Sequence, residues 1–426
     1  MRKISIKTII SILSAKFTLF LTKTILKGGT TFPGRVALKI DKNILSKVSK
    51  GYKVILVTGT NGKTTTTSMI YNIIKESGHP VITNNTGANL FPGIVTTFVD
   101  SFKFGSKVKD NYAVIEVDEA NLKYITEYIT PEVITVTNLF RDQLDRYGEV
   151  YTTLNKILEG IYNVPETTLV LNGDESLLGK LDLKNPVHFY GFDKAVNDNK
   201  TIEINADAKF CKFCKTPYEY NFVTYNHLGD FYCPNCGYKR SDLMYAVTDI
   251  IDINADKSTV KFNDLEVSIN QSGTYNIYNG LCAYSIAKEL GIADSAIKKS
   301  LENQSSSFGR QETINIEGKD VKIFLVKNPA GYNQSLDTIC LNKEKFAAAF
   351  LLNDNYADGQ DVSWIWDVDF EKLTETNIDE VYISGLRAYD MAVRLKTAGL
   401  NPNKFVIEEQ YEALTEAIKN GSCDKL

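Results

Sequence analysis

Short apolar runs alternate with longer stretches of helical periodicity through most of the chain. Four runs have the length and the β-branched content of buried strands: 54–57, 112–117, 133–136 and 168–171. A helical pattern from about Lys63 to Glu76 follows the first run and ends just before Gly78. Such alternation predicts an α/β fold in which helices cover a mostly parallel sheet.

The alternation is interrupted once and then resumes. Between about 206 and 240 the chain is rich in cysteines and aromatic residues, which predicts an inserted unit. Strand patterns return near Val260 and Val267, and a helical stretch from about 276 to 290 ends before Gly291.

The segment 305–309, Ser-Ser-Ser-Phe-Gly, has the composition of a hinge. Three more strand patterns follow it: 321–326, 346–352 and 381–384. We therefore predict a central domain over 51–312 and a smaller, Rossmann-like α/β domain over 313–426.

The region 1–50 contains one amphipathic stretch. Its apolar residues fall on one side of a helix: Ile9, Ile10, Leu13, Phe17, Phe20 and Leu21. Lys16 lies inside the stretch, which is too short to cross a bilayer, and no signal-peptide cleavage site follows it. The favoured interpretation is a helix that packs on its own domain. The alternative is a basic amphipathic helix in peripheral contact with anionic lipid at the inner face of the cell membrane.

Basic side chains dominate this region although the whole chain carries a net charge of −4. Twelve lysines and arginines precede or begin the first strand run, against the single acid Asp41. The acidic remainder argues against a nucleic-acid partner. Seven cysteines without a signal peptide indicate metal ligands or free thiols, and therefore a cytoplasmic chain.

The strand at 54–57 leads into a loop typical of phosphate binding, which opens the next helix: Gly59, Thr60, Asn61, Gly62, Lys63, Thr64 and Thr65. Glycines let the backbone approach a phosphate, and the helix N-terminus attracts negative charge. Lys63 can reach terminal phosphates and Thr64 can bind Mg²⁺, although Val57 stands where the general pattern has glycine. We expect ATP at this loop.

Carboxylates and amides follow two further predicted strands. Glu116 ends one strand, at the edge of the sheet where the loop also lies, and is a candidate Mg²⁺ ligand. A solvated acidic turn is the alternative. Thr137 and Asn138 follow the next strand and should reach the same crevice.

Four cysteines form two Cys-x-x-Cys pairs: Cys211, Cys214, Cys233 and Cys236. Eighteen residues separate the pairs, and Gly237 follows the second, which is typical of a structural zinc ribbon. Sulfur fills all four positions, so no position remains for a catalytic water.

Taken together, these motifs resemble the Mur ligase superfamily. The family's GTNGKTT loop matches residues 59–65, and its metal-binding glutamate matches Glu116. Further matches, in chain order, are Thr137, Asn138, Asp142, Asp145, Asn276, Asn279 and Arg310, while Gln143 stands where the family has histidine. The resemblance implies a ligase that uses ATP and Mg²⁺ to form an acyl phosphate, with Lys63 and Glu116 in catalytic roles. Many members of the superfamily also carry a carbamoylated lysine, and no lysine of this sequence is matched to it.

Two departures from the superfamily pattern resemble its amidating branch. One is the four-cysteine ribbon. The other is the segment 327–331, which keeps only the Asn-Pro pair of the Asp-Tyr-Ala-His-Asn-Pro run usual at this place in the superfamily. The resemblance implies amidation of the D-glutamate α-carboxylate in the stem peptide of lipid II, giving D-isoglutamine. The ammonia would come from a separate, GatD-like glutaminase subunit in a heterodimer. The chain itself offers no Cys-His pair of the glutaminase type, because Cys282 lies in a helical stretch and only three histidines exist.

The resemblance also implies that an aspartate of the last domain completes the partner's Cys-His pair. Asp354, at the end of a predicted strand, is the favoured candidate, with Asp358 and Asp361 as alternatives. The alternative to a catalytic role is that Asp354 only shapes a turn at the end of the strand. Two other functions compete with this one: a ligase that adds an amino acid, as in folylpolyglutamate or muramyl peptide synthesis, and a zinc-ribbon scaffold that is not an enzyme.

Overall fold

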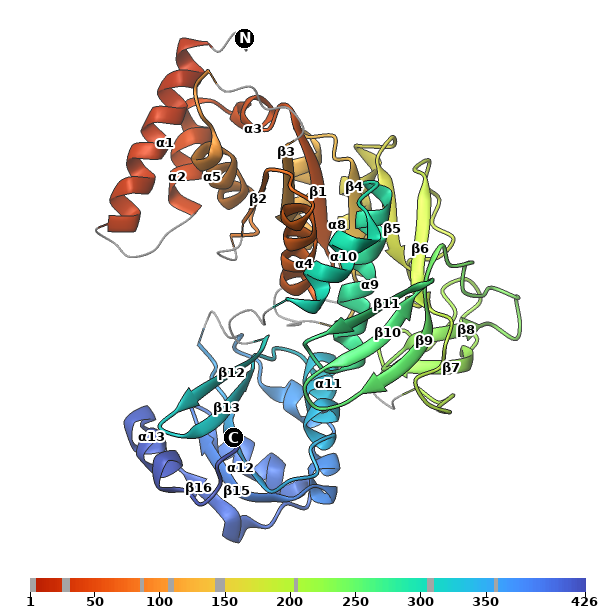
Figure 1. Ribbon diagram of the computed structural model, residues 1–426, viewed down its shortest axis with the longest axis vertical. Coiled ribbons are helices and arrows are strands. Elements are labelled where there is room, and N and C mark those ends of the chain that lie inside the picture. Colours follow the sequence, from red (N-terminus) through yellow and green to blue (C-terminus); the bar gives the residue numbers. More distant parts are fainter. Residues whose placement is uncertain are drawn as a thin grey trace.

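The computed structural model describes residues 5–24, 31–84, 88–105, 111–141, 150–202, 206–304, 310–355 and 359–426. In Figure 1 the N-terminal helices lie at the top left, a large sheet in the middle and a smaller α/β unit at the bottom. Several predicted features lie outside the described residues: the hinge 305–309, Asp142, Gln143, Asp145 and Asp358.

The central sheet has nine strands in the order β11-β10-β9-β6-β5-β4-β1-β3-β2. All pairings from β2 to β9 are parallel, and β9, β10 and β11 pair antiparallel at one edge. Its strands are β1 (Tyr52–Thr58), β2 (Val81–Thr83), β3 (Asn111–Glu116), β4 (Val133–Val136), β5 (Thr168–Asn172), β6 (Val187–Phe192), β9 (Tyr245–Ile253), β10 (Ser258–Phe262) and β11 (Leu265–Ile269). The predicted α/β class with a mostly parallel sheet is confirmed.

Helices cover both faces of this sheet, which is why β1 is apolar at successive positions. Ile55 and Val57 point into the core under α4 (Lys63–Glu76), α9 (Thr274–Glu289) and α10 (Asp294–Glu302). Val54 and Leu56 point into the core under α5 (Phe91–Ser101), α6 (Leu122–Thr126) and α8 (Val150–Tyr162). The loop after β1 therefore leaves a rigid, doubly covered strand.

The cysteine-rich insertion lies between β6 and β9, which are neighbours in the sheet. It carries the antiparallel hairpin β7 (Glu219–Tyr225) and β8 (Leu228–Tyr232). A small core of its own surrounds two of the cysteines: Cys211, Tyr218, Tyr220, Val223, Phe231, Cys233 and Tyr238. The predicted insertion is thus a separate packing unit attached to the main sheet.

The N-terminal segment forms α1 (Ile6–Thr24), α2 (Thr31–Ile40) and α3 (Ile44–Val48). Helix α1 does pack on its own domain, against α2 and α5, but through the face opposite to the expected one. Ile10, Leu13, Phe17 and Phe20 are exposed, whereas Ser11 and Ala15 are buried. Among the described helices none combines the length and the apolar character that a membrane span requires.

The C-terminal unit begins with the hairpin β12 (Arg310–Ile316) and β13 (Lys319–Phe324). Its own parallel sheet consists of β14 (Phe346–Leu351), β15 (Ile378–Ser384) and β16 (Phe405–Ile407), with the helices α11 (Pro329–Cys340), α12 (Ala388–Thr397) and α13 (Tyr411–Asn420). Phe350, Phe370 and Ile383 belong to its separate core. The domain bounds given above, 1–50, 51–312 and 313–426, remain a proposal.

Candidate functional site

The phosphate-binding type of loop joins the end of β1 to the start of α4. Gly59 and Gly62 both have positive φ angles, 117° and 82°, which favour glycine. A Cβ at Gly59 would lie 2.4 Å from Thr137 Oγ1, and one at Gly62 would lie 2.2 Å from Asn279 Oδ1. Both positions therefore require glycine. The loop leads directly into α4, whose first backbone N–H groups are the kind of donors that bind phosphate.

The segment after β4 holds the backbone of this loop. Asn138 Oδ1 accepts the Asn61 N–H at 2.8 Å, and the backbone oxygen of Asn138 accepts the Thr60 N–H at 3.0 Å. Thr137 Oγ1 donates to the Asn61 oxygen at 2.7 Å. Asn138, predicted to bind the nucleotide, is thus placed as a support of the loop in this structure.

Lys63 lies in the loop among oxygen acceptors. Its Nζ donates to Gly59 O at 2.5 Å and to Glu119 Oε1 at 2.7 Å, and both charged side chains are largely buried. Sequence analysis did not select Glu119, although a second carboxylate three residues after Glu116 is a visible signal. Lys63 is the side chain best placed to meet a phosphate at this loop.

Glu116 ends β3 beside β1, in register with Val57. Its side chain is buried, and Oε1 accepts a hydrogen bond from Asn89 Nδ2 at 3.1 Å. Asn84 fixes its backbone, accepting the Glu116 N–H at 2.9 Å and donating to the Glu116 oxygen at 2.8 Å. The adjacent strand thus brings this carboxylate to the same sheet edge as Thr64, although their metal-binding roles remain a prediction.

Two predicted asparagines come from the N-terminal half of α9. Asn279 Oδ1 accepts from Thr66 Oγ1 at 3.2 Å, and its Nδ2 donates to Asn276 Oδ1 at 3.2 Å. Both side chains are buried beside the first turn of α4. Helix α9 therefore closes one side of the loop, while the nucleotide-binding roles of the two asparagines remain a prediction.

The C-terminal unit reaches the loop through Asn328, which precedes α11. Asn328 Nδ2 donates to Asn61 Oδ1 at 2.9 Å, and Asn61 Nδ2 donates to Asn328 Oδ1 at 3.3 Å. Asn328 also accepts the Gly331 N–H at 2.8 Å, so it caps α11. The surviving Asn-Pro pair was the signal in the sequence, but only the fold shows that it touches the loop.

A second amide pairing holds the two units together. Gln311 Oε1 accepts the Ser272 N–H at 3.0 Å, while Gln311 Nε2 donates to the Ser272 oxygen at 2.8 Å. The predicted nucleotide-binding residue Arg310 begins β12, and its side chain lies outside the part that the structure describes.

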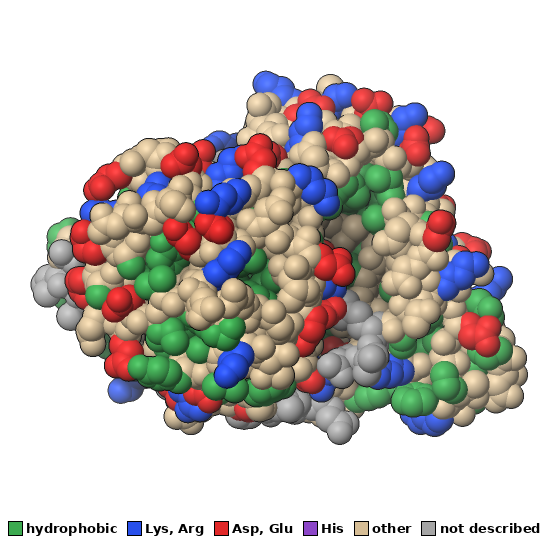
Figure 2. Space-filling view, turned by 90° about the horizontal axis from the view of Figure 1, so that it is seen from below, with side chains coloured by type: hydrophobic (Ala, Val, Ile, Leu, Met, Phe, Trp, Pro, Cys, Tyr) green, Lys and Arg blue, Asp and Glu red, His purple; other side chains and the backbone are tan. Residues whose placement is uncertain are grey.

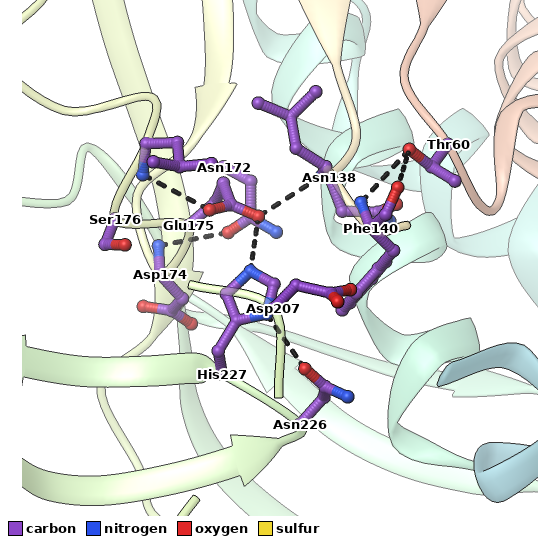
Figure 3. A network of polar contacts seen from close by, with 12 residues as sticks. Thr60, Asn138, Phe140, Asn172, Asp174, Glu175, Ser176, Asp207, Asn226 and His227 are labelled. Carbon is purple, nitrogen blue, oxygen red and sulfur yellow. Dashed lines mark hydrogen bonds and ion pairs between the residues drawn. The ribbon is translucent and has the colours of Figure 1, made fainter. Parts of the chain in front are cut away.

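A buried polar network connects the loop to the cysteine-rich insertion, as Figure 3 shows. His227, in the turn between β7 and β8, places Nε2 2.8 Å from Glu175 Oε2, and neither side chain is exposed. Glu175 also accepts the backbone N–H groups of Leu139 and Leu177, each at 3.2 Å. The His227 ring packs on Phe140 with 5.0 Å between centroids. Phe140 thereby becomes the link between the insertion and the loop.

Thr60 completes this connection on the loop side. Its Oγ1 accepts the Phe140 N–H at 3.1 Å and donates to the Phe140 oxygen at 3.2 Å. The next residue, Arg141, binds Asp207 of the insertion at 2.5 Å and Asp367 of the C-terminal unit at 3.6 Å. One short segment after β4 therefore contacts the loop, the insertion and the C-terminal unit.

Replacing His227 by leucine should destabilise the fold by about 3 kcal/mol, because Glu175 would stay buried without its side-chain partner. The free energy of unfolding, measured with urea, checks this. His188→Leu is the matched control: His188 also pairs with a glutamate, Glu289, at 2.6 Å, but both side chains are partly exposed. That change should cost about 1 kcal/mol or less. Equal losses for the two variants would contradict the importance of the buried pair.

The four predicted zinc ligands are brought together by the fold. Their sulfur atoms all lie within 4.8 Å of one another, with Cys211 3.6 Å from Cys236 and Cys214 3.4 Å from Cys233. A tetrahedron with bonds of about 2.3 Å to zinc has S···S edges of about 3.8 Å. Positive φ angles at Lys215 and Gly237, each just after a cysteine pair, let the chain turn around such an ion. The residues therefore fit a structural zinc.

Asp354 follows β14 at the carboxyl end of the C-terminal sheet. Its Oδ2 lies 3.2 Å from Arg387 Nη1, and Arg387 also binds Asp390 at 2.7 Å. Asp361 caps a short turn by accepting the Ser363 N–H at 2.8 Å, and hydrogen bonding from the Ser363 side chain and backbone lowers its pKa. Leu386 and Tyr389, which lie close to Arg387 in the sequence, are large apolar residues with exposed side chains. Figure 2 shows hydrophobic patches among charged side chains on the face seen from below.

Two of the cysteines outside the ribbon, Cys282 and Cys340, are not suited to glutamine hydrolysis. Cys282 is buried in α9 within 3.2 Å of Thr135 Oγ1, and burial raises its pKa to about 11. Burial also raises the pKa of Cys340. Since a thiolate is the nucleophile in such reactions, neither side chain is activated in this chain.

Comparison with known proteins explains this combination of features. The family model of the Mur ligase middle domain matches residues 57–237, and that of the MurT ligase C-terminal domain matches residues 325–426. The MurT subunit of lipid II isoglutaminyl synthase (glutamine-hydrolysing) from Streptococcus pneumoniae is 40% identical over 98% of this chain and 93% of its own. The chain belongs to the MurT family. The MurT subunit from Staphylococcus aureus is 34% identical over 95% of this chain and 91% of its own.

Solved structures share the Mur ligase fold. A pseudomurein peptide ligase type C from Methanothermus fervidus has a TM-score of 0.67 at 21% identity, covering 90% of this chain and 76% of its own. The MurF ligase from Thermotoga maritima in complex with ADP has a TM-score of 0.61 at 13% identity, covering 91% and 79%. The segment matched as MurT C-terminal domain contains both Asn328 and Asp354.

Proposed function

We propose that this MurT-family chain is the ligase subunit of a lipid II isoglutaminyl synthase. It amidates the α-carboxylate of D-glutamate in the stem peptide of lipid II, using ATP and ammonia from a separate glutaminase subunit. The observation that carries the proposal is a GTNGKTT loop with Lys63, Glu116 and Glu119 around it, in a chain 40% identical to a MurT subunit over nearly its full length. The expected residue roles below are part of the proposal.

The loop and its neighbours form a cradle for MgATP. When bound, MgATP supplies the phosphoryl group that turns a carboxylate into an acyl phosphate. The N–H groups at the start of α4 hold phosphate oxygens, and Lys63 exchanges its contact with Glu119 for one with the transferred group. Thr64 and Glu116 supply oxygen ligands for Mg²⁺. Asn276 and Asn279 keep α9 against the loop, and Arg310 leads the chain into the C-terminal unit.

The nitrogen source is a second chain, for which we infer a GatD-like glutaminase. Cys282 does not supply the nucleophile of such a reaction, since it lies buried in α9 and burial raises its pKa to about 11. The relatives' names describe a glutamine-hydrolysing enzyme with MurT as a subunit. Asp354, at a sheet edge of the C-terminal unit, would complete the partner's Cys-His pair.

The four-cysteine cluster holds a structural zinc ion that fixes the insertion. The ion would be shielded from catalysis, because four thiolates leave no open coordination position. Its purpose is mechanical: it anchors the hairpin that carries His227, whose network reaches Phe140 and the loop.

Purified protein should contain about one zinc ion per chain. Cys233→Ser should release most of it and lower the thermal midpoint, because the small core around the cysteines depends on the ion. Elemental analysis and a thermal scan measure the two effects. Cys340→Ser, outside the cluster, is the control and should keep the zinc. Full zinc retention in Cys233→Ser would contradict the assignment.

The enzyme acts in the cytoplasm at the inner face of the cell membrane. Lipid II is membrane-linked, so a chain without a spanning helix among its described residues would meet it from the surface.

The decisive experiment co-expresses the chain with a glutaminase partner and supplies lipid II, ATP, Mg²⁺ and glutamine. Mass spectrometry should show that one OH of the stem peptide is replaced by NH₂, with ATP consumed in equal amount. Ligation of a free amino acid instead would show the alternative, amino-acid-adding function. Absence of any product with ammonia as well as with glutamine would refute the ligase assignment.

A further inference from the structure

Helix α1 has its apolar face turned outward. Five large apolar side chains point away from the protein: Ile6, Ile10, Leu13, Phe17 and Phe20. Phe17 is 64% exposed and Phe20 is 63% exposed. Spacings of four, three, four and three residues place all five on one face of the helix, along a stripe about 21 Å long. Soluble helices bury such a stripe, so this one requires an explanation.

The inner face of α1 combines two large apolar residues with small and hydroxyl ones. Its buried residues are Thr8, Ser11, Ile12, Ala15, Leu19 and Thr22. Thr8 Oγ1 donates to Asp41 Oδ2 at 2.8 Å, and Ser11 Oγ donates to the Ala37 oxygen at 2.9 Å. These bonds fix the rotation of the helix. Large apolar side chains thus occur on the outer face as well as on the packed face, as expected of a helix whose outer solvent is lipid.

Basic side chains accompany the stripe. The segments 5–24 and 31–50 contain eight of them, Lys7, Lys16, Lys23, Arg35, Lys39, Lys42, Lys47 and Lys50, against the single acid Asp41. Asp41 is buried and paired with Lys47 at 2.6 Å. On the neighbouring helix α5, Asp100 pairs with Lys23 at 3.2 Å, but the basic side chains of these segments still outnumber the acids around α1. A lipid surface with anionic headgroups complements both the charge and the apolar stripe.

A second copy of the chain is a poorer occupant, because it would bring two sets of the same basic side chains together. The C-terminal unit, which carries Asp354, lies at the opposite end of the molecule in Figure 1, so a partner bound there leaves α1 free. The described helices include none that could span the bilayer, which leaves an interfacial position.

We infer that the outward face of α1 inserts into the interfacial layer of an anionic bilayer and holds the enzyme on the membrane. The five apolar side chains reach the acyl boundary, while basic side chains such as Lys7 meet the phosphates. If the proposed function holds, this face also brings the enzyme to its lipid-linked substrate. The membrane contact itself does not depend on the amidation reaction.

The test is flotation of the purified full-length chain with vesicles of phosphatidylcholine and phosphatidylglycerol. Wild type should float with these vesicles, less so at high salt, and hardly at all with phosphatidylcholine alone. Phe17→Asp/Phe20→Asp should weaken binding by roughly tenfold or more, because carboxylates resist transfer to the acyl boundary. Tyr162→Asp, an exposed aromatic at the end of α8, is the matched control and should bind like wild type.

Two results would overturn the inference. One is equal flotation of wild type and the double variant. The other is a stable dimer in light scattering that the double variant abolishes, which would assign the face to a second copy. Far-UV circular dichroism verifies that the variant is folded. Amidation of a short-chain, water-soluble lipid II analogue should be unchanged in the variant, so loss of membrane contact and failure of the proposed reaction are distinguishable.

Discussion

Replacing Lys63 by methionine should reduce ATP-dependent amidation by about 10³-fold or more, even at saturating ATP. Lys63 Nζ is the cation in the loop, held between Gly59 O and Glu119 in a largely buried position. Methionine keeps most of the unbranched side chain and removes the ammonium group with its charge and its hydrogen-bond donors. The rate should be measured with ammonia as nitrogen source, so that the partner subunit does not enter.

Lys75→Met is the matched control, because Lys75 lies on the last turn of the same helix and is exposed. Its rate should stay within about twofold of wild type, as expected of a surface substitution. Both variants should unfold at similar urea concentrations. An active Lys63→Met enzyme would show that the transferred phosphate does not lie at this loop.

Asp354→Asn should abolish glutamine-dependent amidation while leaving ammonia-dependent amidation within about twofold of wild type. An aspartate that orients a histidine is worth on the order of 10⁴ in rate in hydrolases of the Ser-His-Asp type, and a Cys-His pair uses the same logic. The measurement compares glutamine with a high concentration of ammonia in the assembled complex. Loss of both activities would assign Asp354 a structural role instead.

Two further variants make this test sharper. Asp390→Asn removes the other carboxylate bound to Arg387, so it reproduces the local change in charge without touching Asp354. It should keep both activities. Asp361→Asn tests one of the two alternative candidates, an aspartate whose side chain caps its own turn. Selective loss in Asp361→Asn, with normal Asp354→Asn, would move the role to Asp361.

Local sequence patterns predicted the middle of the molecule well because they arise from local physics. Helix α4 begins at Lys63 and ends at Glu76, and β4 spans 133–136, as expected. Strands buried on both faces are continuously apolar, and glycines end helices where φ turns positive, as at Gly78 and Gly291. The two Cys-x-x-Cys pairs likewise fix which sulfurs meet.

Other features were beyond such patterns. Strands β6 and β9 carry only short buried runs: β6 is buried over its last three residues, and β9 over its first three, beyond which it is half-buried or exposed. Glu119 and Asn328 carry a signal in the sequence but none that shows what they contact, and the His227–Glu175 pair carries no local signal at all. The paired residues lie 52 positions apart, and Asn61 and Asn328 lie 267 apart.

Sequence by itself determined the α/β class, the phosphate loop with Lys63, the cysteine quartet and the family resemblance. Each of these depends on spacing within a few residues, which the chain carries from the start. Only the tertiary structure decided that Asn138 supports the loop, that Asn328 touches it, and that the apolar face of α1 points outward. An amphipathic pattern states that a helix has an apolar side. Which side packs is settled by the partners, here the polar bonds from Thr8 and Ser11.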